Sequence, residues 1–243
     1  MSTFFKYAFG ELLLVVFGIL IALQIDAWYE DQKDEAYASY LLSKIHDDLK
    51  SDLQFFHRAI EVRQSVKEKG IENFLRHIEN EEQASEAEYL EYYDDMNILY
   101  LMTYQTTGYQ ELKNRGTKII SNTELRDKLI DIYEVTQPRL SKFIHQDDAY
   151  LKELSRKFEQ ANFMITKKGS NPHGLSLKDS DLLANNDFRH LLRLIDGDSE
   201  HKRFRLRILY RNYDEMMQLL ETELAKRGIE YESFDPESVK PDF

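Results

Sequence analysis

One stretch decides the fold: Lys6-Tyr-Ala-Phe-Gly-Glu-Leu-Leu-Leu-Val-Val-Phe-Gly-Ile-Leu-Ile-Ala-Leu-Gln-Ile-Asp-Ala-Trp28. A helix over residues 7–28 rises about 1.5 Å per residue and covers roughly 33 Å, close to the ~30 Å hydrocarbon core of a bilayer. Aromatic residues stand at its two ends, Tyr7 at one and Trp28 at the other, where membrane–water interfaces favour them. We therefore predict a transmembrane helix over residues 7–28, with Tyr7 and Trp28 as its interfacial anchors.

Glu11 and Asp26 oppose insertion, but the apolar residues of the stretch outweigh them. About twelve Leu, Ile, Val and Phe side chains between Ala8 and Ile25 each favour insertion by roughly 0.3–0.6 kcal/mol. A carboxylate costs at most about 3 kcal/mol at the bilayer centre, and both carboxylates lie near an end of the span. Insertion is therefore the favoured outcome.

Two other interpretations of the stretch remain open. A cleaved signal peptide would need a basic start, an uninterrupted apolar region and a small-residue cleavage site. Here Lys6 is the only basic residue, Glu11 interrupts the start, and Ile25-Asp26-Ala27 is a poor cleavage site. A core helix in a soluble oligomer is the second alternative, because the apolar run 12–23 alone has core-helix length.

Composition restricts the function of the remaining chain. The 243 residues include 44 acidic and 32 basic ones, a formal net charge of −12, which argues against a nucleic-acid partner. The absence of cysteine excludes disulfides, thiolate catalysis and cysteine-bound metals. Motifs for nucleotide binding, serine hydrolysis and zinc proteolysis are also absent from the sequence. We predict that the chain is not an enzyme and carries no cofactor and no metal.

Apolar residues recur at helical spacing through most of the chain, which predicts an all-α fold. The N-terminal helix is expected to continue from the membrane to a stop at Gly70, followed by a short helix over 71–78. The acidic stretch 79–95 is interpreted as solvated or mobile, since such charge runs rarely pack. Residues 1–6 are predicted to be a tail.

The second half of the chain carries start and stop signals for three further helices. Thr107 with Gln110 is interpreted as a capping box for a short helix that ends at Gly116, and Ser121 with Glu124 as a capping box for a long one. Pro138 must kink or divide the long helix because it removes a hydrogen bond and clashes with the preceding turn. A loop follows at Lys167–Pro172. The last helix is expected to start at Asn186 or Asp187, to be interrupted at Gly197 and to stop at Gly228.

Together these signals predict one transmembrane helix that continues into an antiparallel helical bundle. The bundle domain is expected over residues 29–228 and a loosely held tail over 229–243. The Lys and Arg distribution around the span favours a cytoplasmic N-terminus, with the bulk of the chain outside the cytoplasm.

Several segments resemble a family of uncharacterised membrane proteins from flavobacteria and their relatives, catalogued as a domain of unknown function. The similar segments, with the span as the most specific, are Tyr7–Glu11, Gly18–Ile25 with Trp28, Tyr109–Gly116, Ile120–Arg126 and Asp187–Leu192. The relatives usually carry a longer basic leader and an Asn pair where Asp26-Ala27 stands here. The resemblance implies a membrane-anchored helical protein of a Gram-negative inner membrane and implies no activity.

The span carries a candidate helix-association face. Glu11, Val15, Gly18 and Ala22 follow one another at spacings of four, three and four, so they share one side of a helix. Gly18 and Ala22 form a small-xxx-small pair that lets two helix backbones approach closely, and a partner helix would shelter Glu11 from lipid. A carboxylate inside a span is also a functional candidate for moving protons or ions. The alternative, that Glu11 only sets helix depth or capping, is favoured about two to one because Glu11 lies near an end.

Two other groups of residues invite weaker hypotheses. His46-Asp47-Asp48 and His145-Gln146-Asp147-Asp148 contain metal-ligand types, but adjacent residues point to different helix faces, so surface polar roles are favoured. A basic patch is interpreted as an internal ion-pair lattice with the acidic stretch 79–95; it comprises Lys202, Arg203, Arg205, Arg207 and Arg211, with Tyr210 and Tyr213 beside it.

Two functions from different classes remain. The first is a non-catalytic, membrane-anchored interaction or scaffold protein that contacts membrane lipid and forms a homo-oligomer or binds another membrane protein. The second is an ion-coupled transport or energy-coupling subunit that uses Glu11. A ligand-sensing helical domain is a third, weaker option.

Overall fold

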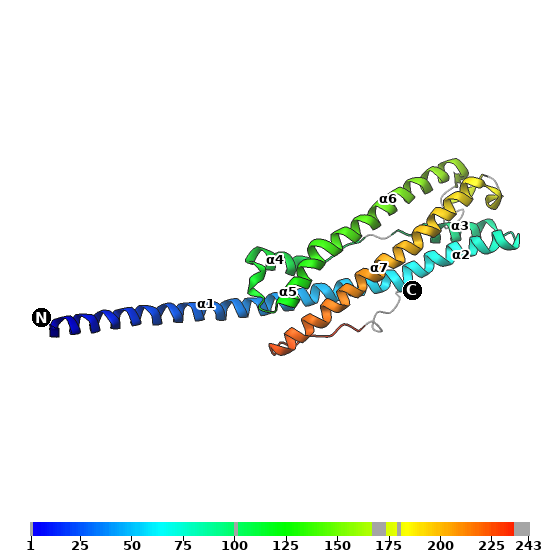
Figure 1. The fold of residues 1–243 in the computed structure, drawn as a ribbon. Helices are drawn as coiled ribbons and strands as arrows, with labels where there is room; N and C mark the ends of the chain where they lie inside the picture. Colours follow the sequence, from blue (N-terminus) through cyan, green and yellow to red (C-terminus); the bar gives the residue numbers. More distant parts are fainter. Residues whose placement is uncertain (1, 100–101, 167–173, 179–180, 236–243) are drawn as a thin grey trace.

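A continuous helical rod runs from the N-terminus to the far end of the molecule (Figure 1). The computed structural model describes residues 2–99, 102–166, 174–178 and 181–235, with side chains from residue 9 onward. The rod consists of α1 (Ser2–Arg58), the π-helical turn η1 (Ala59–Arg63) and α2 (Gln64–Asn80). At 1.5 Å per residue it is about 120 Å long. The prediction that the membrane helix continues into the bundle is confirmed.

Gly70 does not stop this rod, contrary to the prediction. The helix ends at Asn80, where Glu81 takes a left-handed conformation with φ of 56°. Gly70 is buried inside α2 and faces α3 (Glu86–Met96). A Cβ atom at Gly70 would lie 2.7 Å from Asp95 Cβ and 2.8 Å from the carbonyl oxygen of Tyr92. The glycine therefore allows two helix backbones to approach closely.

The acidic stretch contains a packed helix, so the expectation of a solvated or mobile run over 79–95 is wrong for α3. Ser85 caps α3 through a capping box with Glu88, whose carboxylate accepts a hydrogen bond from the Ser85 amide at 2.8 Å. One face of α3 is buried in the core through Tyr89, Leu90, Tyr93 and Met96. Most of its acidic residues lie on the opposite, exposed face.

The next helices begin at residues adjacent to the predicted caps. α4 (Thr107–Arg115) has Thr106 rather than Thr107 at its N-cap, and the Gly108 amide there donates to Asp48 Oδ2 of α1 at 2.8 Å. α4 ends before Gly116 as predicted, and the 3₁₀ turn η2 (Thr117–Ile119) follows. α5 (Thr123–Ile130) is capped by Asn122, one residue after the predicted Ser121.

Pro138 has the predicted effect on the long helix. α5 passes into the π-helical turn η3 (Asp131–Thr136) and then into α6 (Gln137–Asn162), with Pro138 in the first turn of α6. A proline amide cannot donate a hydrogen bond, and the widened turn before it accommodates that loss.

The last helix has the predicted extent but is continuous. The antiparallel strands β1 (Phe163–Ile165) and β2 (Leu175–Leu177) precede it, with Phe163 paired to Leu177 and the 3₁₀ turn η4 (Leu182–Ala184) next. The predicted loop at 167–172 lies outside the described residues. α7 (Asn186–Lys226) is capped by Asn185 and runs through Gly197 without interruption, which corrects the predicted break. Gly228, with φ of 70°, lies just beyond its end, where the sequence placed the stop.

These helices form the predicted all-α bundle, in which α7 runs antiparallel to both the rod and α6 (Figure 1). The core consists of two hydrophobic clusters. The proximal cluster lies nearer the N-terminal helix and is formed mainly by α1, α4, α5 and the second half of α7. The distal cluster is formed by α2, α3, the end of α6 and the first half of α7. Buried polar residues lie between them.

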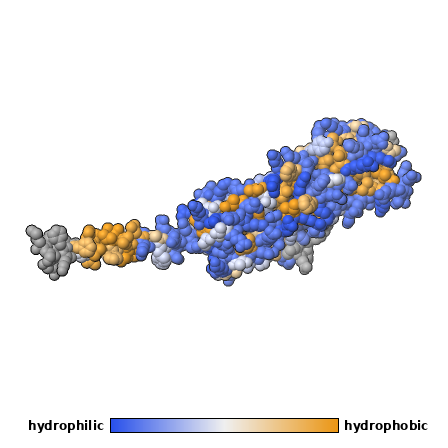
Figure 2. Space-filling model, in the orientation of Figure 1, coloured by the Kyte–Doolittle hydropathy of each residue, from blue (hydrophilic) through white to orange (hydrophobic). Residues whose placement is uncertain are grey.

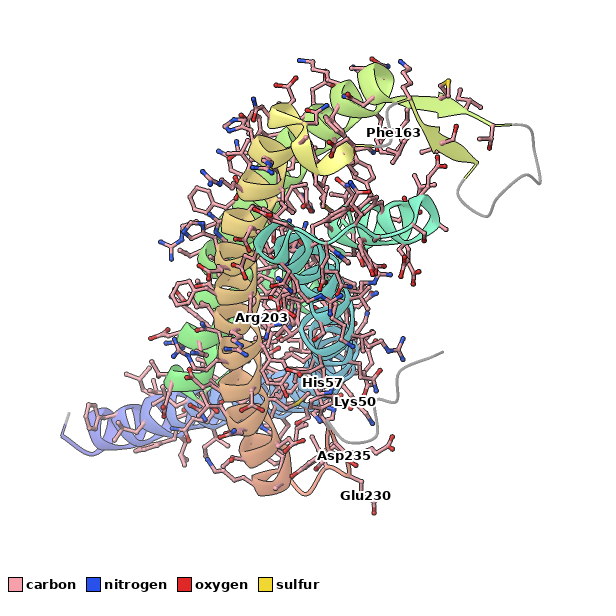
Figure 3. The ribbon with its side chains drawn as sticks, turned by 90° about the vertical axis from the view of Figure 1, so that its right-hand side faces the viewer. Lys50, His57, Phe163, Arg203, Glu230 and Asp235 are labelled. Atoms are coloured by element: carbon pink, nitrogen blue, oxygen red, sulfur yellow. The ribbon has the colours of Figure 1, made fainter. Side chains whose placement is uncertain are left out.

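The described part of the C-terminal tail packs against the bundle, contrary to the expectation that it is loosely held. Ile229 and Phe234 contact the proximal cluster, and the Tyr231 ring lies 5.3 Å from the His46 ring. Lys50 pairs with Glu232 at 2.8 Å, on the side of α1 where Figure 3 places Lys50 near the tail. Residues 236–243 lie outside the described residues.

Candidate functional site

The N-terminal part of α1 projects from the bundle and exposes its apolar side chains. Among the described residues, one helix is long and apolar enough to cross a membrane, and an 18-residue window in it has a mean hydropathy of 2.1. None of that window is buried. The exposed apolar side chains run from residue 9 to residue 28, and this segment is here called the apolar sleeve. Figure 2 shows it as a continuous hydrophobic surface outside the hydrophilic surface of the bundle. An apolar surface of this kind needs lipid or a protein partner to cover it.

The predicted association face lies entirely on this projecting helix. Glu11, Val15, Gly18 and Ala22 are all exposed, and α1 is unbroken through them, so they share one side of the helix. A Cβ at Gly18 would meet nothing within 4 Å, which means that packing within the described chain does not require the glycine. Trp28 is 63 % exposed at the end of the sleeve, whereas the Tyr7 side chain lies outside the described residues.

The bundle begins directly after the apolar sleeve. Arg115 of α4 pairs with Asp34 at 2.6 Å, and Arg227 pairs with Glu35 at 2.6 Å. Glu111 accepts hydrogen bonds from both Tyr37 and Lys44 at 2.7 Å, which ties α4 to α1. Asp34 lies six residues after Trp28, about 9 Å along the helix. A membrane around residues 7–28 would therefore lie next to this end of the bundle.

A second candidate site is a group of buried and half-buried polar residues between the two hydrophobic clusters, here called the polar layer. The buried members are Gln64, Lys67, Asp148, Ser199 and Lys202, and the half-buried ones are Glu68, Asp198 and Arg203. Lys202 on α7 is 0 % exposed and pairs with Asp148 of α6 and, at 3.0 Å, with Asp198. Gln64 of α2 donates to the Ser199 hydroxyl at 2.7 Å. Three helices are thus joined by polar contacts at the middle of the bundle.

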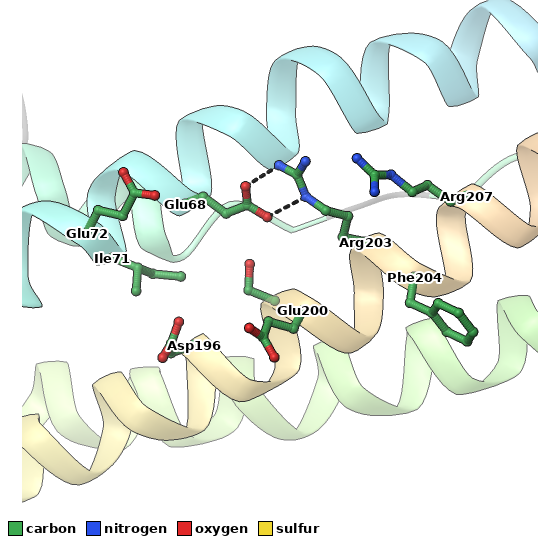
Figure 4. A pocket seen from close by; sticks show the side chains of 9 residues that line it. Glu68, Ile71, Glu72, Asp196, Glu200, Arg203, Phe204 and Arg207 are labelled. Carbon is green, nitrogen blue, oxygen red and sulfur yellow. Dashed lines mark hydrogen bonds and ion pairs between the residues drawn. The ribbon is translucent and has the colours of Figure 1, made fainter.

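The outer edge of the polar layer borders a groove of about 420 Å³ between α2 and α7 (Figure 4). Glu68 and Arg203 form a bidentate ion pair across it, with Arg203 Nε donating to Glu68 Oε1 at 2.7 Å. Burial and the nearby carboxylates of Glu200 and Glu68 raise the pKa of Asp196 in this groove. The groove therefore combines acidic groups with an arginine that is already paired.

The basic patch predicted on α7 does form ion pairs, but not with the predicted acids. Lys202 pairs with Asp148, Arg203 with Glu68, and Arg205 with Asp147. These acids belong to α2 and α6 rather than to the stretch 79–95. The sequence indicated that these basic residues form ion pairs. Which acids they pair with depends on which helices pack against α7, and the sequence did not show that.

Residues of the two His–Asp motifs, at 46–48 and 145–148, contact other helices of the bundle. His46 is buried, and its Nε2 lies 3.5 Å from Glu221. Asp48 caps α4, and the acids of the second motif, Asp147 and Asp148, take part in the ion pairs with α7. Within the described part of the chain, no three potential metal ligands converge.

Asp52 is a buried acid that the sequence interpretation missed. It is 2 % exposed in the proximal cluster, and its Oδ1 accepts a hydrogen bond from the Gln105 amide at 3.0 Å. Its Oδ2 and the hydroxyls of Tyr133 and Tyr213 have no hydrogen-bond partner among the described residues. Burial, together with the charge of Asp48, raises the pKa of Asp52 to about 7, although the Gln105 amide acts in the opposite direction. A signal was present, because Asp52 continues the apolar stripe of Ile45 and Leu49.

A comparison with models of protein families gives a match over most of the chain. A model described as a family of unknown function, DUF6090, matches residues 11–197. The matched range begins at Glu11 in the apolar sleeve and extends into α7. No match was found among curated proteins or among solved structures.

Proposed function

We propose that this chain, which belongs to the DUF6090 family of unknown function, is a non-catalytic, membrane-anchored interaction or scaffold protein. The proposal includes a single span over residues 7–28 in a bacterial inner membrane, with the N-terminus in the cytoplasm and the bundle in the periplasm. The observation that carries it is the apolar sleeve, which is unburied and continuous with the central rod of the bundle.

The continuity of α1 through the sleeve and into the bundle supports a mechanical role for the anchor. No proline interrupts the rod, and ion pairs at Asp34 and Glu35 fix its entry into the bundle. A helix held in this way keeps the bundle at a defined distance and direction from the membrane. A partner bound to either part would thus be positioned relative to the other.

The sleeve also supports association with a second span. Lipid gives no hydrophobic driving force between helices, so close backbone packing must supply the attraction. Gly18 costs about 1 kcal/mol of helix stability relative to alanine and serves no packing within the described chain. A helix that packs against Gly18 and Ala22 would compensate for this cost and would shelter Glu11.

Crosslinking of the full-length protein in membranes tests the association. Gly18→Ile and Ala22→Ile insert branched side chains into the proposed face and should reduce the crosslinked dimer or higher oligomer severalfold. Ala27→Ile is the matched control, because position 27 lies nine residues, about 180°, from position 18 around the helix. A protein that stays monomeric with and without these changes would refute association through the span.

Glu11→Gln distinguishes this function from the ion-coupled alternative. The change preserves shape and hydrogen bonding but removes the titratable proton. If the chain is an interaction or scaffold protein, Glu11→Gln should leave both its assembly and its cellular phenotype unchanged. Gly18→Ile should then disturb both. Intact assembly with a lost phenotype in Glu11→Gln would favour the ion-coupled subunit instead.

A further inference from the structure

Lys67 of α2 is a buried cation that forms no direct ion pair among the described residues. Its side chain is 1 % exposed, and its described hydrogen bond is donated to the carbonyl oxygen of Ile98 at 3.3 Å. An ammonium group has three donors, so two of them have no described acceptor. No described carboxylate lies within ion-pair distance of Lys67 Nζ. Asp148 and Asp198 pair directly with the neighbouring Lys202, and their charges act on Lys67 from farther away.

Burying an ammonium group costs free energy when some of its donors stay without an acceptor, even with the charges of Asp148 and Asp198 nearby. Burial, and then the charge of Lys202, lowers the pKa of Lys67 to about 8. An apolar side chain at this position would avoid that cost. The lysine is consistent with a binding role that outweighs its effect on stability.

Lys67 lines a cavity of about 230 Å³ between α2, α6, the start of α7 and residues 97–99. Leu151 and Ile195 give the cavity buried apolar walls. The polar groups of Asn97 and Ser155 there already bond each other, with Ser155 Oγ donating to Asn97 Oδ1 at 2.5 Å. Lys67 is thus a buried group that offers unused hydrogen-bond donors to an occupant.

Charge at the cavity favours an anion, although the whole chain is acidic with a net charge of −12. Lys67 lies at its wall, and the exposed side chains of Lys152 and Arg156 line it as well, although Arg156 is already paired with Glu153 at 3.0 Å. Glu159 is the one carboxylate among the described lining residues. A cleft with an excess of positive groups raises the local concentration of anions.

We propose that this cavity binds a small monocarboxylate with a compact apolar body, whose carboxylate accepts hydrogen bonds from Lys67. At about 30 Å³ per water-sized group, 230 Å³ holds roughly seven or eight such groups, fewer than a drug-sized ligand contains. One ammonium matches one carboxylate, and the walls formed by Leu151 and Ile195 match a branched aliphatic chain. Binding would join α2, α6 and α7 at the polar layer.

Thermal unfolding of the full-length protein in detergent micelles tests the site, with sodium isovalerate as the probe at constant ionic strength. The unfolding temperature should rise saturably with isovalerate and much less with acetate, isoamyl alcohol or sodium phosphate. Acetate lacks the apolar body, the alcohol lacks the charge, and phosphate lacks both the body and the single carboxylate. No saturable rise with isovalerate, or an equal rise with phosphate, would overturn the assignment.

Lys67→Met is the decisive variant. Methionine has a side chain of similar length and removes the buried ammonium, and circular dichroism of the variant without ligand checks that it folds. Its affinity for isovalerate should fall at least about tenfold. Lys128→Met is the matched control, since Lys128 pairs with Glu215 at 2.7 Å between α5 and α7, and it should keep wild-type affinity.

Leu151→Phe provides a second variant that keeps the ammonium and narrows the cavity. It should weaken isovalerate binding more than acetate binding. Undiminished isovalerate binding in both Lys67→Met and Leu151→Phe would place the ligand elsewhere and refute the site. These results do not depend on how the span inserts or associates, so failure here is distinguishable from failure of the membrane anchor.

Discussion

Asp52 lies on the apolar stripe of α1 and is therefore buried in the proximal cluster, away from water. A carboxylate that loses water without gaining a counter-ion holds its proton more tightly. Protonated Asp52 would have a hydroxyl to donate, and the Tyr133 and Tyr213 hydroxyls next to it lack described partners. Burial raises the pKa of both tyrosines further above 10, so they stay neutral throughout the range in which Asp52 titrates.

The titration of Asp52 predicts a pH-dependent stability. Its pKa is about 7 in the folded protein against 3.8 for the ordinary side chain, so between these values the folded state holds a proton that the unfolded state has lost. Stability should therefore fall as pH rises from about 4 to about 7, by roughly 1.4 kcal/mol per pKa unit. Asp52→Asn should remove this fall and be more stable than wild type at pH 8, by a few kcal/mol.

Urea unfolding of both proteins between pH 4 and pH 8 measures this effect. Asp31→Asn is the control, because Asp31 is exposed on the same helix, and its substitution should leave the fall in stability caused by Asp52 in place. Parallel profiles for wild type and Asp52→Asn would show that Asp52 does not titrate in this range.

Gly70 and Gly197 occupy helix interiors in different surroundings, so the same substitution should have opposite effects. Gly70→Ala places a Cβ within 3 Å of backbone atoms of α3 and should destabilise the protein by about 1–3 kcal/mol. A Cβ at Gly197 meets nothing within 4 Å, so Gly197→Ala should stabilise α7 by up to about 1 kcal/mol. Thermal unfolding measures both, and an unchanged or raised unfolding temperature for Gly70→Ala would contradict the close approach of α2 and α3.

Helix positions were predictable from the sequence, whereas several helix ends were not. Apolar periodicity located the rod, α6 and α7, and Pro138 marked the irregular turn correctly. Gly70 and Gly197 were wrongly interpreted as a stop and an interruption, because a glycine stops a helix only when it adopts a left-handed conformation, as Gly228 does. α3 was missed because its buried aromatic face is interleaved with acidic residues.

For the polar layer, the sequence predicted that ion pairs form but not which residues form them. The basic residues of α7 signalled ion pairs, but the partners are set by which helices meet, and α2 and α6 are distant in sequence. The Lys67 cavity gave no sequence signal, because a single lysine within a charged segment is ordinarily solvated. The Asp52 environment had the faint signal of an acid on an apolar stripe.

The buried ion pairs of Lys202 predict a large effect on helix association. Lys202→Met leaves Asp148 and Asp198 without this cation and should cost about 3–5 kcal/mol, because a buried charge loses its counter-charge. Arg211→Met provides the control: Arg211 is 70 % exposed, its pair with Glu215 is 4.0 Å long, and its loss should cost at most about 1 kcal/mol. Equal unfolding free energies for the two variants, measured in urea, would show that the polar layer does not hold α6 and α7 together.

The whole molecule is an apolar sleeve and a helical bundle built on one continuous rod (Figures 1 and 2). The sequence predicted this architecture well, since a largely apolar stretch of 22 residues and long amphipathic stripes leave few alternatives. Whether lipid or protein covers the sleeve is a property of its surroundings rather than of the chain's own packing. The membrane anchor therefore requires a measurement on the full chain in cells.

Site-specific labelling makes that measurement directly, because the chain contains no cysteine. Single-cysteine variants Ser2→Cys and Ser51→Cys, expressed in a Gram-negative host, are treated with a membrane-impermeant maleimide in intact spheroplasts and again after lysis. The account predicts that Ser51→Cys, exposed on the bundle, reacts in intact spheroplasts, and that Ser2→Cys reacts only after lysis. Equal protection of both positions until lysis, with the protein in the soluble fraction, would contradict the membrane anchor, and reaction of Ser2→Cys alone would reverse its orientation.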